Sequence, residues 1–144
     1  MELKMDIPAL DAFLRQEFPQ VSADFVIETL TQDTLVVRLR TSDKHLRPGG
    51  TISGPAMFAL ADVAVYLAIL ARLGPVALAV TTNCSIDFMR KPAAGKDITG
   101  HTRILKMGRS LAVGDVLLYS EGDDKPVARA SLTYAIPPVK KGPD

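Results

Sequence analysis

Apolar residues follow one another almost without interruption from position 55 to position 71, with only the hydroxyl of Tyr66 and the carboxylate of Asp62 between them. A helix that is apolar on nearly every side must be covered on nearly every side. The segment therefore predicts a buried central helix over residues 54–73. Because burying an ionised Asp is costly unless something compensates it, Asp62 needs a structural or functional reason to be there.

Elsewhere the pattern alternates between short strand-like runs and polar turns. In TLVVRLR, for example, Leu35, Val37 and Leu39 take every second position, which is typical of a strand with one buried face. Tight turns between successive runs indicate antiparallel neighbours. The predicted strands are residues 24–30, 34–40, 77–89, 97–107, 110–120 and 126–136.

The N-terminal segment, residues 1–20, predicts a short amphipathic helix. Asp6 can cap it, Pro8 suits its first turn, and Leu10 and Leu14 share one face. The predicted order is helix, two strands, one long helix and four strands. We therefore expect an α+β fold in which one antiparallel sheet wraps around the central helix, with the whole chain, 1–144, forming a single domain.

Composition narrows the function classes. A formal net charge of +1 over 144 residues gives no basic field of the kind that binds nucleic acid. The single cysteine, Cys84, rules out an intrachain disulfide and favours a reducing, cytoplasmic location. The apolar run is at the short end of the membrane-spanning range and carries Asp62 near its middle, so a buried helix is favoured over a membrane span. No spacing of Cys and His suggests a metal site.

Two stretches of the sequence resemble a known family. GGTISGPAMFALADVAVYLAI, residues 49–69, is similar to the helix segment of hotdog-fold acyl-CoA thioesterases of the phenylacetic-acid-degradation (PaaI-like) type, whose pattern is G-[ST]-hydrophobic-H-G-G followed within the helix by L-[AVS]-D. SIDFMRKPAAGKD, residues 85–97, resembles that family's N-I-x-F-L-R-P-A-x-x-G-D strand and turn. The resemblance extends from Phe25 to Ile136.

Three positions depart from the family pattern. Ser53 stands where the family has His, Pro55 replaces its second Gly, and Arg47 falls where relatives often have Asn. The carboxylate, Asp62, and the first helix glycine, Gly54, are both present. The departures concern how the thioester oxygen and the attacking water are positioned, whereas the acid and the backbone donor remain.

The resemblance implies a hotdog fold that hydrolyses acyl- or aroyl-CoA thioesters to the free acid and CoA, without a cofactor. It implies that the amide of Gly54 polarises the thioester carbonyl, that Asp62 acts as a general base or as a nucleophile, and that Thr81 holds the water. We favour the general base. Two plainer alternatives are that Asp62 is a structural acid bonded to Tyr66, four residues on, and that Thr81 is an ordinary strand threonine.

The spacing of the two main catalytic candidates, given this mechanism, requires an oligomer. Gly54 and Asp62 are eight positions apart, which is roughly 12 Å along a helix axis. One carbonyl group cannot lie within about 3 Å of both in the same chain. Two such helices running antiparallel across a two-fold axis would bring Gly54 of one subunit beside Asp62 of the other. We therefore expect a homodimer with shared active sites, assembling as in the family into a homotetramer.

Four further residues are candidates for substrate binding near these positions. Phe58 and Tyr66, one turn either side of the acid, are placed to limit the length of an acyl group or to stack on an aromatic ring. Arg47 and Ser53 occupy the positions of the family's Asn and His, although Ser53 also suits a plain helix cap.

Cations flank two of the predicted turns. Arg90 and Lys91 follow one strand, and Lys106 and Arg109 border the next hairpin. They are candidates for binding the phosphates of coenzyme A, or they form an ordinary solvated rim. Because the family's His and Asn are replaced, a rival function is a non-catalytic acyl-CoA-binding hotdog module that acts as a sensor or carrier.

Overall fold

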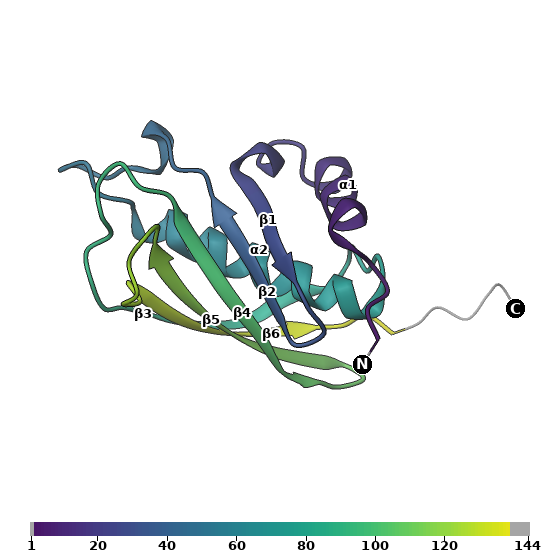
Figure 1. Cartoon of the computed structure of the whole chain (residues 1–144). Helices are drawn as coiled ribbons and strands as arrows, with labels where there is room; N and C mark the ends of the chain where they lie inside the picture. Colours follow the sequence, from purple (N-terminus) through teal and green to yellow (C-terminus); the bar gives the residue numbers. More distant parts are fainter. Residues whose placement is uncertain (1, 139–144) are drawn as a thin grey trace, which may run out of the picture.

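The computed structural model describes residues 2–138, which form one antiparallel sheet with a long helix against it (Figure 1). The strands lie in the order β1-β2-β4-β5-β6-β3, and every neighbouring pair is antiparallel. Two short 3-10 turns, Ser22–Asp24 and Asp43–His45, precede β1 and follow β2. The helices and strands are α1 (Ile7–Glu17), β1 (Phe25–Leu30), β2 (Thr34–Leu39), α2 (Gly54–Leu73), β3 (Val80–Phe88), β4 (Ile98–Met107), β5 (Leu111–Ser120) and β6 (Ala128–Ala135).

The predicted α+β class, with an antiparallel sheet around a central helix, is confirmed. The central helix has the predicted bounds, and each predicted strand segment contains one observed strand. The N-terminal helix is shorter than the predicted 1–20, because the Asp6 carboxylate caps it by accepting from Ala9 N–H and Phe18 ends it. Residue 1 and residues 139–144, which the predicted single domain includes, lie outside the described residues.

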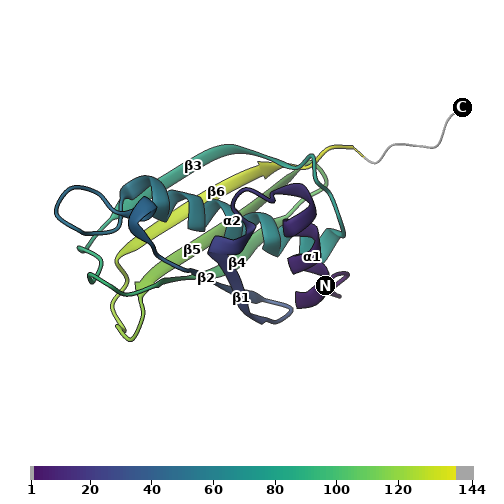
Figure 2. The same ribbon diagram turned by 90° about the horizontal axis from the view of Figure 1, so that it is seen from above.

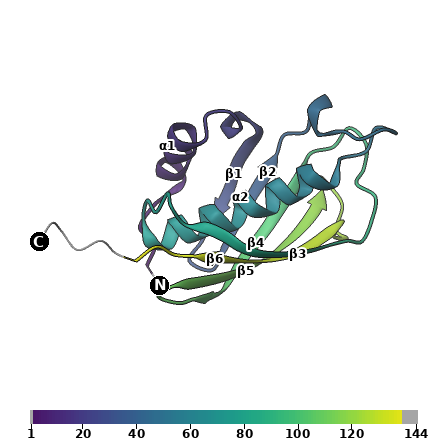
Figure 3. The same ribbon diagram turned by 180° about the vertical axis from the view of Figure 1, so that it is seen from behind.

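The central helix α2 crosses one face of the sheet and packs mainly on β2, β4 and β5 (Figures 2 and 3). Leu60 and Val65 on this side of α2 are fully buried. Glycines in the strands permit the close approach. A Cβ added to Gly114 of β5 would lie 3.2 Å from both γ-carbons of Val65, and one added to Gly100 of β4 would lie 3.4 Å from Leu60 Cγ. The helix α2 therefore packs closely on the sheet at the glycine positions, where the strands have no side chain.

By length and composition alone, α2 is also apolar enough to cross a membrane. However, 72% of its most apolar 18-residue window is buried inside the described chain. A helix covered in this way by its own sheet has found the apolar environment that its sequence requires. The burial supports the prediction of a core helix rather than a membrane span.

The N-terminal helix α1 covers only the C-terminal half of α2 (Figure 1). The ring of Tyr66 meets Phe13 at a centroid distance of 6.4 Å and Phe18 at 5.6 Å. Towards the N-terminus of α2 this cover stops, and Phe58 is 38% exposed. We call the exposed side chains of this half, Pro55, Phe58 and Ala59, together with the half-buried Asp62 beside them, the open helix face.

Strand β3 lies beside the open helix face and forms one edge of the sheet. Within the described residues it pairs with β6 alone, so one side of its backbone has no partner strand. An unpaired edge is a template for another strand, particularly when it carries apolar side chains. Exposed apolar residues in and around β3 are Leu78, Val80, Phe88 and Met89. The molecule thus leaves two adjoining apolar surfaces uncovered.

We expect Gly114→Ala to destabilise the fold by about 1–3 kcal/mol, the usual cost of overpacking a core. Val65 cannot rotate away from the added methyl group, because both of its γ-carbons are equally close and its χ1 is restricted in a helix. Gly100→Ala, with its wider contact, is the control and should cost less. Urea denaturation followed by circular dichroism measures both, and equal stability of Gly114→Ala and the wild type would contradict the packing argument.

Candidate active site

The half-buried carboxylate of Asp62 lies where the cover of α2 by α1 stops. Thr81 Oγ1 on β3 and Tyr134 Oη on β6 each donate a hydrogen bond to its Oδ1, both at 2.6 Å. Tyr134 Oη also lies 3.0 Å from the main-chain oxygen of Asp62. Three elements that are distant in the sequence therefore meet at one carboxylate oxygen, and two predicted site residues, Asp62 and Thr81, are in direct contact.

The other carboxylate oxygen, Oδ2, makes no hydrogen bond or ion pair within residues 2–138. Over the same residues, Thr102 Oγ1 is the one buried side-chain oxygen or nitrogen without a partner. Oδ2 of Asp62 is therefore in reach of solvent. A carboxylate held through one oxygen and open at the other is suited to accept a proton.

A bulge in β3 directs Thr81 towards α2. Thr81 pairs with Tyr134 and Asn83 with Thr133, so Thr82 is an extra residue that has no partner in the ladder. Under strict alternation counted back from Asn83, Thr82 would face the helix instead. Bulges change the direction of side chains in this way and are common next to active sites.

The titratable groups around the carboxylate are neutral donors or thiols. Burial, and next the negative charge of Asp62, raise the pKa of Tyr134, so its hydroxyl remains protonated and able to donate. The same two causes raise the pKa of the Cys84 thiol on β3. Burial, together with Glu17 of α1, raises the pKa of Tyr66 to about 12. Hydroxyl groups, and no cation of the described chain, therefore contact the Asp62 carboxylate.

Among the described residues, the N-terminus of α2 presents one free backbone donor. Ser53 caps the helix by accepting from Ala56 N–H at 3.2 Å, and Pro55 has no N–H. The N–H of Gly54 makes no hydrogen bond in the described part of the chain. Unpaired N–H groups at a helix N-terminus favour negative charge. A Cβ on Gly54 would lie 3.2 Å from the ring of Phe88, an exposed side chain, so the position is tight on its sheet side.

The two predicted aromatic contacts differ in their exposure. Phe58 lies on the open helix face, accessible to a ligand. Tyr66 is 6% exposed beneath α1, and its hydroxyl donates to the Ala77 carbonyl at 3.2 Å. The suggested bond between Asp62 and Tyr66 is wrong, since Asp62 bonds to Thr81 and Tyr134 instead. Of the predicted aromatic pair, only Phe58 is open at the described surface.

The four predicted phosphate-binding cations do not gather within one chain. Main-chain N–H of Arg90 donates to the Val127 carbonyl, which places Arg90 and Lys91 at the start of β6. Lys106 and Arg109 border the β4–β5 turn, where Leu111 pairs with the end of β6. The two pairs are separated by the length of that strand, roughly 25 Å. The two pairs are far apart because each lies beside a different end of β6 in the antiparallel sheet.

Arg47 and Ser53 lie on the loop that leads into α2. Arg47 is exposed, and its main chain closes a turn by donating from N–H to the Thr51 carbonyl at 2.9 Å. Ser53 is the helix cap that its sequence position suggested. Both residues are close to Gly54 in the chain, and neither contacts Asp62 through a hydrogen bond.

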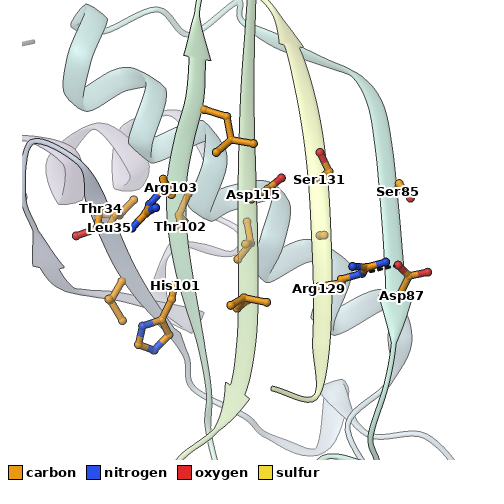
Figure 4. A pocket seen from close by; sticks show the side chains of 15 residues that line it. Thr34, Leu35, Ser85, Asp87, His101, Thr102, Arg103, Asp115, Arg129 and Ser131 are labelled. Atoms are coloured by element: carbon orange, nitrogen blue, oxygen red, sulfur yellow. Dashed lines mark hydrogen bonds and ion pairs between the residues drawn. The ribbon is translucent and has the colours of Figure 1, made fainter. Parts of the chain in front are cut away.

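A cavity of about 740 Å³ lies on the opposite face of the sheet from α2 (Figure 4). Its walls are outward side chains of the strands, among them His101, Arg103, Asp115 and an Arg129–Asp87 ion pair. None of the predicted site residues lines it. The candidate site is therefore the carboxylate on the helix side, beside an uncovered surface, and not this hollow.

Tyr134 was not among the residues singled out from the sequence. Its signal is present in ARASLTY, where Ala130, Leu132 and Tyr134 share the alternating core-facing positions of β6. A tyrosine on the buried face of a strand requires a hydrogen-bond partner for its hydroxyl. Asp62 needs such a donor, so the two residues are candidate partners, and strand order and register decide whether they meet.

Comparison with known proteins gives a consistent result. Residues 49–127 match the family described as the thioesterase superfamily. A candidate esterase of Pseudomonas aeruginosa is 34% identical over 106 residues, which are 74% of this chain and 78% of that protein.

Solved structures extend the likeness to the whole fold. A candidate thioesterase from Silicibacter sp. TM1040 is 57% identical with a TM-score of 0.90, covering 96% of each chain. A mutant of the phenylacetic acid degradation protein PaaI from Thermus thermophilus is 30% identical with a TM-score of 0.71, covering 83% of this chain and 99% of that one. A hypothetical thioesterase from Streptococcus pneumoniae, solved with coenzyme A, has the same fold. It is 20% identical with a TM-score of 0.76, covering 92% of this chain and all of that one.

We expect the folded chain to lose stability as the pH rises from about 10 to 12. An unfolded tyrosine ionises near pH 10, whereas the pKa of Tyr66 is raised to about 12 in the folded chain. A group whose pKa is raised by folding contributes its stability below the unfolded value and loses it above. The urea midpoint should therefore fall less between pH 9 and pH 11 in Tyr66→Phe than in Tyr119→Phe. Tyr119 lies on the other face of the sheet and serves as the control. Equal falls in the two variants would refute this prediction.

Proposed function

The chain belongs to the thioesterase superfamily, and from this premise we propose that it hydrolyses acyl- or aroyl-CoA thioesters at sites shared between two subunits. The observation that carries the proposal is the Asp62 carboxylate, anchored at Oδ1 by two hydroxyls and open at Oδ2. The likeness to PaaI, a phenylacetic acid degradation protein, supports an aromatic or other apolar acyl group. A related fold that holds coenzyme A supports CoA as the thiol.

A complete site needs a second copy of the chain. Gly54 and Asp62 are the first and ninth residues of α2, roughly 12 Å apart along its axis. The oxyanion donor and the base must both reach one thioester carbonyl. A two-fold pairing with antiparallel helices brings Gly54 of one subunit to Asp62 of the other, and does so twice.

The uncovered surfaces support this pairing. The open helix face and the edge of β3 adjoin each other, because Thr81 bonds to Asp62 at one end and Phe88 reaches Gly54 at the other. Adjoining apolar surfaces of this kind are typical of protein interfaces. Docking two copies here would cover Phe58 and give β3 a partner strand. We infer a homodimer through this surface, with further association to a homotetramer.

The same two-fold arrangement bears on the phosphate-binding candidates. Antiparallel β3 edges place the end of β3 in one subunit beside the start of β3 in the other. Arg90 and Lys91 of one subunit would then lie at the same end of the assembly as Lys106 and Arg109 of its partner. Cations that are far apart in one chain would in this way flank one coenzyme A.

The proposed reaction has two stages. Oδ2 of Asp62 accepts a proton from a water while the water oxygen bonds to the thioester carbon, and the negative charge that develops on the carbonyl oxygen is stabilised by the N–H of Gly54. The carbonyl then re-forms, the carbon–sulfur bond breaks, and the proton held by Asp62 passes to the thiolate. The products are the carboxylic acid and free coenzyme A. Direct attack by Asp62 to give a mixed anhydride is the alternative course for the first stage.

The replacement of the family's His and Asn by Ser53 and Arg47 favours one rival function, a non-catalytic acyl-CoA-binding module. Ser53 is engaged as a helix cap, so its hydroxyl accepts from Ala56 and orients the loop rather than a substrate. Binding without turnover would distinguish this function from hydrolysis.

We expect Asp62→Asn to lower kcat by about 10²- to 10⁴-fold, the range for loss of a general base. The amide keeps the shape and an acceptor oxygen but cannot take the proton. Thiol release from a panel of acyl- and aroyl-CoAs, followed with a thiol reagent, measures the effect. Asp115→Asn, on the far face of the sheet, is the matched control. A wild type no faster than Asp62→Asn on every substrate, yet able to bind them, would support the non-catalytic module.

A shared site predicts complementation between two inactive variants. Gly54→Pro removes the N–H and suits the first helical position, and Ser53 already has the extended backbone that precedes proline. Its added Cβ meets the ring of Phe88, which is exposed and can move aside. Co-expression with Asp62→Asn makes about half of the dimers mixed, each with one intact site composed of Gly54 from one subunit and Asp62 from the other. Activity should recover to about a quarter of wild type. No recovery in purified mixed dimers would mean that each site lies within one chain.

A further inference from the structure

Tyr134 makes the contact that the proposed reaction leaves without a role. Its Oη lies 2.6 Å from Oδ1 of Asp62 and 3.0 Å from the main-chain oxygen of the same residue. Thr81 Oγ1 shares Oδ1 at 2.6 Å. Both hydroxyls therefore contact the same oxygen of the carboxylate, and Oδ2 is left to point away from them.

The tyrosine is held firmly enough to orient its partner. The residue is 3% exposed, and its main chain pairs with Ala112 of β5 on one side and Thr81 of β3 on the other. Its ring packs 6.0 Å from that of Tyr66, beneath α1. A ring with two torsions, buried between two strands and a helix, gives the hydroxyl a nearly fixed position.

On the basis of the proposed function, we propose that Tyr134 is a positioning residue for hydrolysis: its hydroxyl, with that of Thr81, binds Oδ1 of Asp62 and so presents Oδ2 to the attacking water. Hydrogen bonds to a carboxylate favour its ionised form. They also restrict rotation of the carboxyl group, which keeps Oδ2 in line with the water through the reaction. Tyr134 does not touch the substrate in this scheme and acts through Asp62.

The surroundings of the carboxylate make these hydroxyls important. The negative charge of Asp62 raises the pKa of two side chains, Tyr134 from β6 and Cys84 from β3, and both are neutral at physiological pH. Asp62 makes no ion pair within residues 2–138. Because no cation of the described residues pairs with it, the carboxylate depends on hydroxyl donors for its charge and its orientation.

Tyr134→Phe tests the proposal, because it removes one oxygen and keeps the ring that fills the core. We expect kcat to fall about 10- to 100-fold, the equivalent of one hydrogen bond to a charged group, with KM changed less than threefold. The acid limb of the pH–rate profile should move to higher pH, because the ionised base has lost a donor. Tyr119→Phe, on the other face of the sheet, is the control and should leave both unchanged.

A second variant covers the case in which Tyr134→Phe does not fold. Replacing Tyr134 with a difluorotyrosine keeps the shape and makes the phenol a stronger donor, so the acid limb should move to lower pH. Unchanged kcat and an unmoved acid limb in whichever of these variants folds would overturn the positioning role. Failure of the proposed function itself has a different signature, which is a wild type no faster than Asp62→Asn. In that case the NMR signal of the Asp62 carboxyl carbon, followed against pH in the wild type and in Tyr134→Phe, tests the Tyr134 contact without turnover.

Discussion

The contact of two hydroxyls with one oxygen of Asp62 is the interaction on which the site depends. A carboxylate in an otherwise apolar helix would destabilise the fold if it met only hydrocarbon. Thr81 and Tyr134 compensate it, and in doing so they join α2 to the two strands at one side of the sheet. The same bonds that make the acid tolerable also leave its second oxygen free. One set of hydrogen bonds therefore both compensates the charge of Asp62 within the fold and leaves one of its oxygens free for chemistry.

That arrangement follows from how the rest of the chain covers α2. The sheet takes the inner side of the helix, with Gly100 and Gly114 allowing close approach, and α1 takes the outer side over its C-terminal half. The cover stops at Asp62, so the acid lies where a buried helix becomes an exposed one. Phe58 is exposed at this end of the helix, which is therefore open to solvent in the described chain. An unpaired β3 edge beside it extends the same surface.

Much of the fold could be predicted from local patterns. Alternation located the strands, and a nearly continuous apolar run located α2, because both patterns depend on neighbours within a few positions. The apolar run singled out Asp62, and the family resemblance added Thr81 as a candidate. The contact between Asp62 and Tyr134, 72 positions apart, depends on strand order and register, which no local pattern encodes. For the same reason the separation of Arg90 from Lys106 and the covering of Tyr66 by α1 became apparent only in three dimensions.

The extra residue in β3 has a consequence for how robust the site is. The bulge selects Thr81 to face the acid, and a strand without it would turn Thr82 inward. Both residues are threonines, so the one that strict alternation would turn towards the helix also carries a γ-hydroxyl. A hydroxyl donor beside the carboxylate is therefore encoded in either phase of this strand.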